Sequence, residues 1–246
     1  MKITPIKTHK IAPYKESIFG VLDKYIRVLH DDSIIVVTSK IVSVCEGSII
    51  KTTDIDKEEL IEKEADLYLP PVETKYNYHL TIKNNLMVFA AGIDESNGNG
   101  FYILWPQDPQ KSANSIRSYL KNKFQLKRIG VLITDSKTTP LRAGTTGISL
   151  THSGFAAVKS YIGKPDIFGR NLKLQKVNMA DSLASAAVTV MGEGNEQTPI
   201  ALIEDVSFVQ FQDRNPTKEE LGEFHVPIQD DLYSPLIQNT KWQKKK

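Results

Sequence analysis

Three short segments of the chain each carry an acidic residue beside glycine, serine or asparagine, directly after an apolar run. They are GIDESN at 92–97, ITDS at 133–136 and MGEGNE at 191–196. Apolar runs that stop at such polar junctions are typical of strand ends, where folds often carry binding and catalytic groups. The segments lie far apart in the chain, so only a fold can unite them. The pattern predicts one composite, oxygen-rich site for metal and phosphate.

Length and cysteine content narrow the possible architectures. The 246 residues suffice for a full core, either as one large domain or as two smaller ones that share an interface. The single cysteine, Cys45, excludes an internal disulfide framework and a four-cysteine zinc site. It lies in the strand-like run around 42–44, which predicts a buried apolar side chain and not a nucleophile.

The small net charge and the lack of targeting signals predict a cytoplasmic protein whose main partner is neither nucleic acid nor a membrane. The N-terminal stretch MKITPIKTHK lacks the apolar core of a signal peptide, and no apolar run reaches the length of a membrane span. The net charge of +2, from 31 basic and 29 acidic residues, argues against nucleic acid or a membrane surface as the main partner. The end of the chain, WQKKK at 242–246, is expected to be a solvated, frayed tail.

Hydrophobic periodicity and turn residues divide the chain into elements. Strands are predicted at 3–11, as an edge strand, and at 34–37, 86–91 and 129–133, the last ending at Thr134 and Asp135. Helices are predicted at 17–29, 54–67, 112–122 and 179–191. The stretches 68–78, 92–100 and 142–154 are predicted to be irregular, the second as a functional loop fed by a strand.

Oxygen ligands are what hard cations such as Mg²⁺ and Mn²⁺ prefer. Asp94, Asp135 and Glu193 supply carboxylates, and Ser136 supplies a hydroxyl. Each acid alone is more simply explained as a residue that caps or turns its own loop. The case for a metal site rests on all three sharing the same setting.

Phosphates are commonly held by glycine-rich turns and basic side chains. Lys40, Arg142 and Arg170 lie beside such turns, although Arg170 is equally well explained as a surface charge. Four residues of the polar loops are predicted to line a nucleotide: Asn97, Gly192, Gly194 and Asn195. The chain contains no P-loop motif and no GxGxxG after a strand, which argues against those two binding modes.

Histidines and serines give no specific sign of other chemistry. No pair among the five histidines has the spacing of a local zinc motif. His152, the one nearest the predicted pocket, is expected to be a structural residue with satisfied hydrogen bonds. Ser39 and Ser136 have no acid–base partner nearby in sequence, so a hydrolase triad receives no specific support.

Seven segments, taken in order, resemble one family. They are SKIVSVCEG from Ser39, AGIDESN from Ala91, LWPQDPQKSA from Leu104, ITDS from Ile133, RAGTTG from Arg142, DIFGR from Asp166 and VNMADSLASAAVTVMGEGNEQTP from Val177. Together they resemble the coenzyme F(420):L-glutamate ligases, γ-glutamyl ligases that extend a deazaflavin cofactor. The likeness runs in register over most of the chain, which makes it far more specific than one short motif.

The resemblance implies an α+β fold of mixed sheets with flanking helices and two interlocked subdomains, assembled as an intertwined homodimer. In this chain the ligase domain would span 1–235, with a subdomain boundary near 85–95 and a return near 190, before a basic tail at 236–246. It also implies an amide ligase that uses GTP, or ATP as the alternative, with two Mg²⁺ or Mn²⁺ ions and help from a monovalent cation such as K⁺. Its other substrates would be L-glutamate and a small cofactor acceptor.

The resemblance also assigns roles by position. The metal ligands of the family match Asp94, Asp135, Ser136 and Glu193. Its nucleotide contacts match Ser39, Lys40, Asn97 and the stretch 191–198, which includes Gly192, Gly194, Asn195 and Glu196. A further nucleotide contact matches Thr4 to Lys7. A carboxylate joins an amine in water only after activation, most simply as an acyl phosphate. Lys40 and Arg142 are candidates for stabilising phosphate charge, Lys7 and Arg170 are further phosphate or substrate candidates, and no base is identified.

Three departures from the family pattern concern the acceptor and not the fold. Val44 stands where the family commonly has a lysine, LPPVETKYNYH at 69–79 differs from the usual sequence, and ITPI at 3–6 replaces a GLP-like turn. In these respects the chain resembles a branch assigned to folate metabolism, so F(420)-0 and a folate-like acceptor both stay open. Two other classes also stay open: a metal-dependent phosphohydrolase using the same acids, and a catalytically silent nucleotide-binding or regulatory protein, which Val44 would favour.

Overall fold

The computed structural model describes residues 1–71 and 76–245, and these form a mixture of sheets and helices. The helices are α1 (Ile18–Tyr25), α2 (Ser39–Glu46), α3 (Lys57–Glu64), α4 (Pro109–Lys123), α5 (Met179–Met191), α6 (Lys218–Phe224) and α7 (Ser234–Gln238), with 3₁₀ turns η1 (Ala90–Gly92) and η2 (Ile228–Asp230). The strands are β1 (Lys2–Ile6), β2 (Ile34–Thr38), β3 (Ile49–Lys51), β4 (Leu67–Leu69), β5 (Leu80–Lys83), β6 (Leu86–Phe89), β7 (Phe101–Ile103), β8 (Gly130–Thr138), β9 (Thr145–Ser153), β10 (Val158–Ser160), β11 (Lys176–Asn178), β12 (Ile200–Glu204) and β13 (Gln243–Lys244). The predicted α+β class is confirmed.

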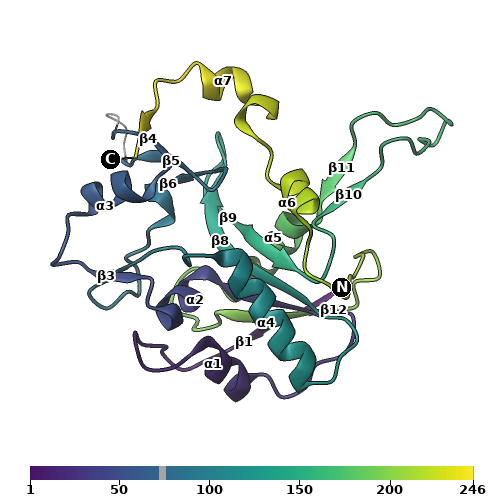
Figure 1. Cartoon of the computed structure of the whole chain (residues 1–246), viewed down its shortest axis with the longest axis horizontal. Helices are drawn as coiled ribbons and strands as arrows, with labels where there is room; N and C mark the ends of the chain where they lie inside the picture. The colour runs from purple at the N-terminus through teal and green to yellow at the C-terminus, as the bar shows by residue number, and fades with distance from the viewer. Residues whose placement is uncertain (72–75, 246) are drawn as a thin grey trace.

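A five-stranded sheet in the order β1-β12-β2-β8-β9 forms the centre of the molecule. Only β2 and β8 run parallel, and the other neighbours are antiparallel. Helices cover both faces (Figure 1), which explains why β2 is apolar at successive positions and does not alternate. Ile35 and Val37 pack in a core with α1 and α4, whereas Ile34 and Val36 pack with α5.

A smaller sheet, in the order β13-β4-β5-β6, lies beside α3 (Figure 1). Its core contains Tyr68 together with Leu60 and Ile61 of α3. The end of the chain does not fray as expected from its lysines, because Gln243 and Lys244 pair with β4 and the indole nitrogen of Trp242 donates to the Ile237 carbonyl. The irregularity predicted for 68–78 is wrong at its start, where β4 includes Tyr68 and Leu69; 72–75 lie outside the described residues.

Two peripheral segments extend from the central sheet (Figure 1). We call residues 158–178 the arm; they contain the β10–β11 ladder and project away from the body. We call residues 216–240 the strap; they contain α6, η2 and α7, and arch over towards the small sheet, where β13 follows.

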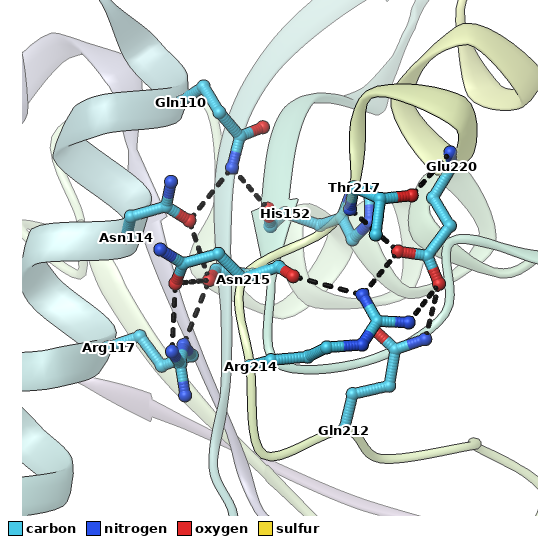
Figure 2. A network of polar contacts seen from close by, with 10 residues as sticks. Gln110, Asn114, Arg117, His152, Gln212, Arg214, Asn215, Thr217 and Glu220 are labelled. Atoms are coloured by element: carbon cyan, nitrogen blue, oxygen red, sulfur yellow. Dashed lines mark hydrogen bonds and ion pairs between the residues drawn. The ribbon is translucent and has the colours of Figure 1, made fainter.

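A polar network fixes the start of the strap between α4 and β9 (Figure 2). The Arg117 guanidinium donates from Nε to Ser153 Oγ at 3.0 Å and from Nη2 to Asn215 Oδ1 at 2.8 Å. Arg214 forms two bonds to the Glu220 carboxylate, at 2.6 and 2.8 Å. Glu220 also completes a capping box with Thr217 at the N-terminus of α6.

Several sequence-based predictions of local structure need correction. Cys45 lies on helix α2 and not in a strand. It is half-buried, and burial, with the charges of Glu16 and Glu46, raises its thiol pKa to about 12, so it is no ready nucleophile. The stretch 142–154 is mostly strand β9, whose small residues serve packing: a Cβ at Gly147 would lie 2.5 Å from the Ala184 carbonyl oxygen of α5.

His152 is structural, as expected, but it is not fully satisfied. The residue is 1% exposed, between the rings of Phe155 and Phe224, and among the described residues its Nδ1 has no hydrogen-bond partner. Burial, and then the charge of His225, lower its pKa to about 4, against a smaller opposing effect of Glu220.

The described helices include none that is both long enough and apolar enough to cross a lipid bilayer.

Candidate active site

A cavity of about 950 Å³ lies at the carboxyl end of β2, beside residues 134–136 of β8, its parallel neighbour in the central sheet. Crevices at this position are the usual binding sites of open α/β sheets. The walls come from residues 8–13, the start of α2, the loop after η1, strand β8 and the loop from α5 to β12. The predicted site residues among the lining are Ser39, Lys40, Asp94, Asn97, Asp135, Ser136, Gly192, Glu193, Gly194, Asn195 and Glu196. The fold thus unites the three acidic junctions.

Helix α2 brings a positive charge to this cavity. β2 passes directly into α2 at Thr38, which caps the helix in an extended conformation without a side-chain bond of its own in the described structure. The first backbone N–H groups of a helix carry partial positive charge. Lys40, in the first turn, places Nζ 2.5 Å from Asp94 Oδ2 and donates to the Ser96 carbonyl and hydroxyl oxygens, both at 3.1 Å.

Asp94 lies at the start of the polar loop that follows η1. Its backbone is fixed against Ile103 by bonds of 2.9 and 2.7 Å, and the Ser96 N–H donates to its Oδ1 at 2.7 Å. Burial acts to raise the pKa of the Asp94 carboxyl, but the hydrogen bond and charge of Lys40, together with the Ser96 bonds, lower it below its usual value. Asp94 is therefore ionised near neutral pH.

Asp135 lies inside strand β8, because β8 continues to Thr138 and does not end at Thr134–Asp135 as predicted. The Trp105 indole Nε1 donates to Asp135 Oδ2 at 2.5 Å, and the Ser136 N–H donates to Oδ1 at 2.8 Å. Burial raises the pKa of Asp135 to about 6 although both hydrogen bonds lower it; the charge of Asp94 also raises it, and Lys40 lowers it. Two neighbouring acids thus differ in their readiness to ionise.

The third acid, Glu193, follows helix α5 and not a strand. The Ser136 hydroxyl donates to Glu193 Oε1 at 2.6 Å, which joins β8 to this loop. The Asn97 amide donates to the Gly194 carbonyl at 3.2 Å, so the Asp94 loop also touches it. These two contacts close a ring of polar segments around the cavity, although the glutamate itself is exposed.

The donor set suits a hard cation. Carboxylate and hydroxyl oxygens line the cavity, and Thr134, beside Asp135, has a buried hydroxyl without a hydrogen-bond partner in the described chain. A ligand in the cavity would satisfy that oxygen. As arranged, however, no three His, Cys, Asp or Glu side chains of the described residues come close enough to hold a metal, and Asp94 is paired with Lys40. The residues therefore fit Mg²⁺ or Mn²⁺ by chemistry, after side-chain rearrangement.

Comparison with known proteins shows which family the chain belongs to. Residues 5–205 match the family described as F(420)-0:gamma-glutamyl ligase. The chain belongs to this family. The coenzyme F(420):L-glutamate ligase of Methanocaldococcus jannaschii is 36% identical over 191 residues, 71% of this chain and 76% of that protein. Its namesakes from Methanococcus maripaludis and Methanosarcina mazei are 34% and 33% identical, over 75% and 73% of this chain and 80% and 76% of their own lengths.

Membership makes the protein an enzyme, a γ-glutamyl ligase that forms an amide bond. Three basic residues singled out in the sequence do not line the cavity of this ligase within the described structure: Lys7, Arg142 and Arg170. Lys7 is exposed just after β1, Arg142 lies at the tip of the β8–β9 hairpin, and Arg170 lies in the arm.

Other residues of the ligase cavity were not predicted. Thr134 was assigned to a strand end without a role, and residues 8–13, including His9, line one wall. Val44, which the resemblance did single out, borders the cavity and also packs with Ile49 and Ile103. Trp105, which donates to Asp135, received no role from the sequence. The sequence carried no local signal for these contacts, since each depends on residues distant in the chain.

Proposed function

We propose that this ligase uses a nucleoside triphosphate, GTP in preference to ATP, to join L-glutamate to a carboxylate of a small cofactor. The reaction proceeds through an acyl phosphate and needs two divalent ions, Mg²⁺ or Mn²⁺, with K⁺ as an auxiliary cation. The observation that carries the proposal is the convergence of Asp94, Asp135, Ser136 and Glu193 with Lys40 on one cavity at the N-terminus of α2.

The first step activates the acceptor. A carboxylate oxygen of the acceptor attacks the terminal phosphorus of the nucleotide, the P–O bond to the nucleoside diphosphate breaks, and the diphosphate leaves. Lys40 and the first N–H groups of α2 would bind phosphate oxygens there. Asp94, Asp135, Ser136 and Glu193 would hold the divalent ions, whose charge neutralises the phosphates. Asn97 and the loop 192–196 would contact the rest of the nucleotide.

The second step forms the amide. The glutamate amine attacks the acyl carbon, the bond to phosphate breaks, and inorganic phosphate leaves as the nitrogen loses a proton. Lys40 is the basic side chain of the cavity nearest the acids, so it also stabilises the departing phosphate. Arg142 lies at the tip of the β8–β9 hairpin and Arg170 lies in the arm. Each would take part in this step only if its segment reaches an active-site cavity.

For the acceptor we propose F(420)-0, with a folate-like carboxylate as the alternative. The family description, F(420)-0:gamma-glutamyl ligase, and the coenzyme F(420) ligases among the relatives support F(420)-0. Val44, which borders the cavity where the family commonly has a lysine, supports an altered acceptor or nucleotide contact. Because both acceptors would bind in the same cavity, one experiment that offers each of them separately can decide between them.

We further propose a homodimer in which the arm and the strap meet between copies. The arm exposes Ile167, Phe168 and Leu174, and the strap exposes Leu232 and Leu236. The arm carries five basic residues and one acidic residue, whereas the strap carries five acidic residues and one basic residue. Exposed apolar side chains on oppositely charged segments are suited to pairing. Replacing Phe168 by Asp should shift the mass measured by light scattering to that of a monomer; an unchanged mass would exclude the arm as the interface.

The decisive experiment is mass spectrometry of the products formed from GTP or ATP, Mg²⁺ or Mn²⁺ and L-glutamate, with F(420)-0 and a reduced folate in separate reactions. We expect a glutamyl mass increment in one reaction, with matching phosphate release. Phosphate release without any increment for either acceptor would favour a metal-dependent phosphohydrolase. Nucleotide binding without phosphate release would favour the silent binder, and either result would overturn the proposal.

A further inference from the structure

Trp105 touches both acidic segments of the cavity at once. It follows β7, is 4% exposed and belongs to the main core. Its indole Nε1 donates to Asp135 Oδ2 at 2.5 Å. Its ring also lies against the backbone of Gly92, where a Cβ would be only 2.2 Å from the indole Cε2. Gly92 immediately precedes the Ile93–Asp94 pair, so one side chain spans from the Asp94 loop to strand β8.

The contact at Gly92 leaves no room for another residue. A Cβ at Gly92 would also lie 2.3 Å from Nε1, the atom that donates to Asp135. Gly92 adopts a φ of +70°, which side chains other than hydrogen rarely allow. The missing side chain lets the Asp94 loop approach the indole, and the thickness of the ring then sets how far this loop stands from Asp135.

The indole is held from the small sheet as well. Lys83 of β5 places Nζ 5.6 Å from the centre of the Trp105 ring, and the same ammonium pairs with Glu64 Oε2 at 2.7 Å. Lys83 is buried, so this cation–π contact is sheltered from water. The indole has therefore little freedom to tilt away from either acid segment.

The consequence for Asp135 is a fixed orientation. Oδ2 accepts the indole N–H and Oδ1 accepts the Ser136 N–H, so rotation of the carboxylate would break both bonds. Each oxygen keeps a second lone pair for another partner. Groups that orient a ligating carboxylate in this way typically affect metal affinity by about 10- to 100-fold.

We propose that Trp105 is a positioning residue of this ligase: its indole fixes the orientation of Asp135 and the spacing of the Asp94 loop, and thereby sets the affinity of the site for Mn²⁺ or Mg²⁺. The inference rests on the proposed function in taking Asp94 and Asp135 as metal ligands. A tryptophan that only filled the core would be replaceable by phenylalanine without effect on the metal.

The first test replaces Trp105 by Phe, which keeps an aromatic ring but removes the N–H donor. Free Mn²⁺ is measured by electron paramagnetic resonance during titration of the protein. We expect the dissociation constant for Mn²⁺ to rise about tenfold. The matched control is Trp242→Phe, a change at the only other tryptophan, which lies near the chain end and should bind Mn²⁺ as the unaltered protein does.

The second test leaves Trp105 in place and uses it as a reporter. In the Trp242→Phe protein it is the only tryptophan, so its fluorescence can be followed as Mg²⁺ is added. A change in emission is expected, and it should be lost when Asp135→Asn is added. This arm remains informative if the Trp105→Phe protein fails to fold.

The outcomes separate this inference from the proposed function. If the unaltered protein binds no Mn²⁺, the assigned metal site is wrong and the proposed function fails with it. If Mn²⁺ binds and Asp135→Asn abolishes binding, while Trp105→Phe binds as tightly as the unaltered protein, only the role of Trp105 is overturned. Silent fluorescence on metal binding would overturn that role as well.

Discussion

Two polar clusters of this ligase differ in the kinds of group that they bring together. The cluster between α4, β9 and the strap consists mainly of amides, hydroxyls and arginines that bond to one another (Figure 2). The cluster at the cavity gathers four carboxylates, those of Asp94, Asp135, Glu193 and Glu196, and only Lys40 among the lining residues forms an ion pair with one of them. A cluster whose groups bond mainly to one another acts as a structural staple, although Arg117 Nη1, Gln212 Oε1 and His152 Nδ1 are buried without a partner among the described residues. An excess of carboxylates open to a cavity has unused acceptors, which marks a binding site.

Replacing Asp135 by Asn should separate the two clusters most sharply. Asn can still accept the Trp105 hydrogen bond, so the fold should persist, but the charge that would hold a divalent ion is lost. We expect ligase turnover to fall about 10³-fold, equivalent to about 4 kcal/mol of barrier, with the melting temperature nearly unchanged. Turnover is measured as phosphate release with glutamate and acceptor present.

Asp54→Asn is the matched control, since Asp54 is exposed and does not line the cavity. Normal turnover by the Asp135 variant would remove the distinction between site and staple.

Acid should destabilise the staple through His152, which is buried beside His225 and Glu220. Its folded pKa of about 4 lies below the ordinary value of 6.5, so the unfolded chain binds more protons between these values. Stability is therefore full above pH 6.5 and falls as pH drops towards 4, by about 3 kcal/mol in total. Urea unfolding at pH 7, 5 and 4 measures this loss.

His152→Gln removes the titrating ring and should flatten that dependence. An equally steep acid dependence in the variant would mean that other groups cause it.

Arg117→Met should weaken the fold without touching the cavity. The change removes the bonds to Ser153 and Asn215 and leaves the buried Ser153 oxygen with one donor fewer. We expect a loss of about 2 kcal/mol in the free energy of unfolding, with Mn²⁺ affinity preserved. The exposed Arg27→Met is the control for losing one positive charge. Weaker Mn²⁺ binding in the Arg117 variant would show that the two clusters are coupled.

Glu220→Gln tests the solvent-facing edge of the same staple. Hydrogen bonds from Arg214, Thr217 and Gln212 lower the Glu220 pKa to about 2, against the opposing effect of burial. An exposed ion pair and one capping interaction are together worth about 1 kcal/mol, so thermal unfolding should shift by only a few degrees. A loss as large as that of Arg117→Met would mean that the edge is as important as the buried centre.

The sequence predicted the elements of this fold better than their contacts. Two buried strands and a core helix were correctly predicted from the apolar runs at 34–37 and 129–133 and from the alanine-rich run at 179–191. Elements that are covered by protein on both sides need small or apolar residues at most positions, and this composition can be read from the sequence. Strand β9 was not predicted, because its glycine and small residues resemble the composition of a loop. In the fold, Gly147 is required instead by the close approach of α5.

The candidate site could be predicted as a set of acids but not as an arrangement. The similar local settings of Asp94, Asp135 and Glu193 indicate a common site, and the fold places all three around one cavity. Their partners could not be inferred, because the Lys40–Asp94 pair and the Trp105–Asp135 bond join segments with no shared local pattern. The glycine-rich neighbourhood of Arg142 indicates a phosphate contact, but the fold places this residue at the tip of the β8–β9 hairpin.

The order of the central sheet affects how this protein is made. Strand β12, at Ile200–Glu204, lies between β1 and β2, which come from the first part of the chain. While the ribosome adds the intervening residues, β1 has no neighbour and β2 keeps one edge unpaired. Open strand edges in incomplete chains invite association with other nascent chains. Synthesis therefore passes through a long interval in which β1 is unpaired and one edge of β2 is open.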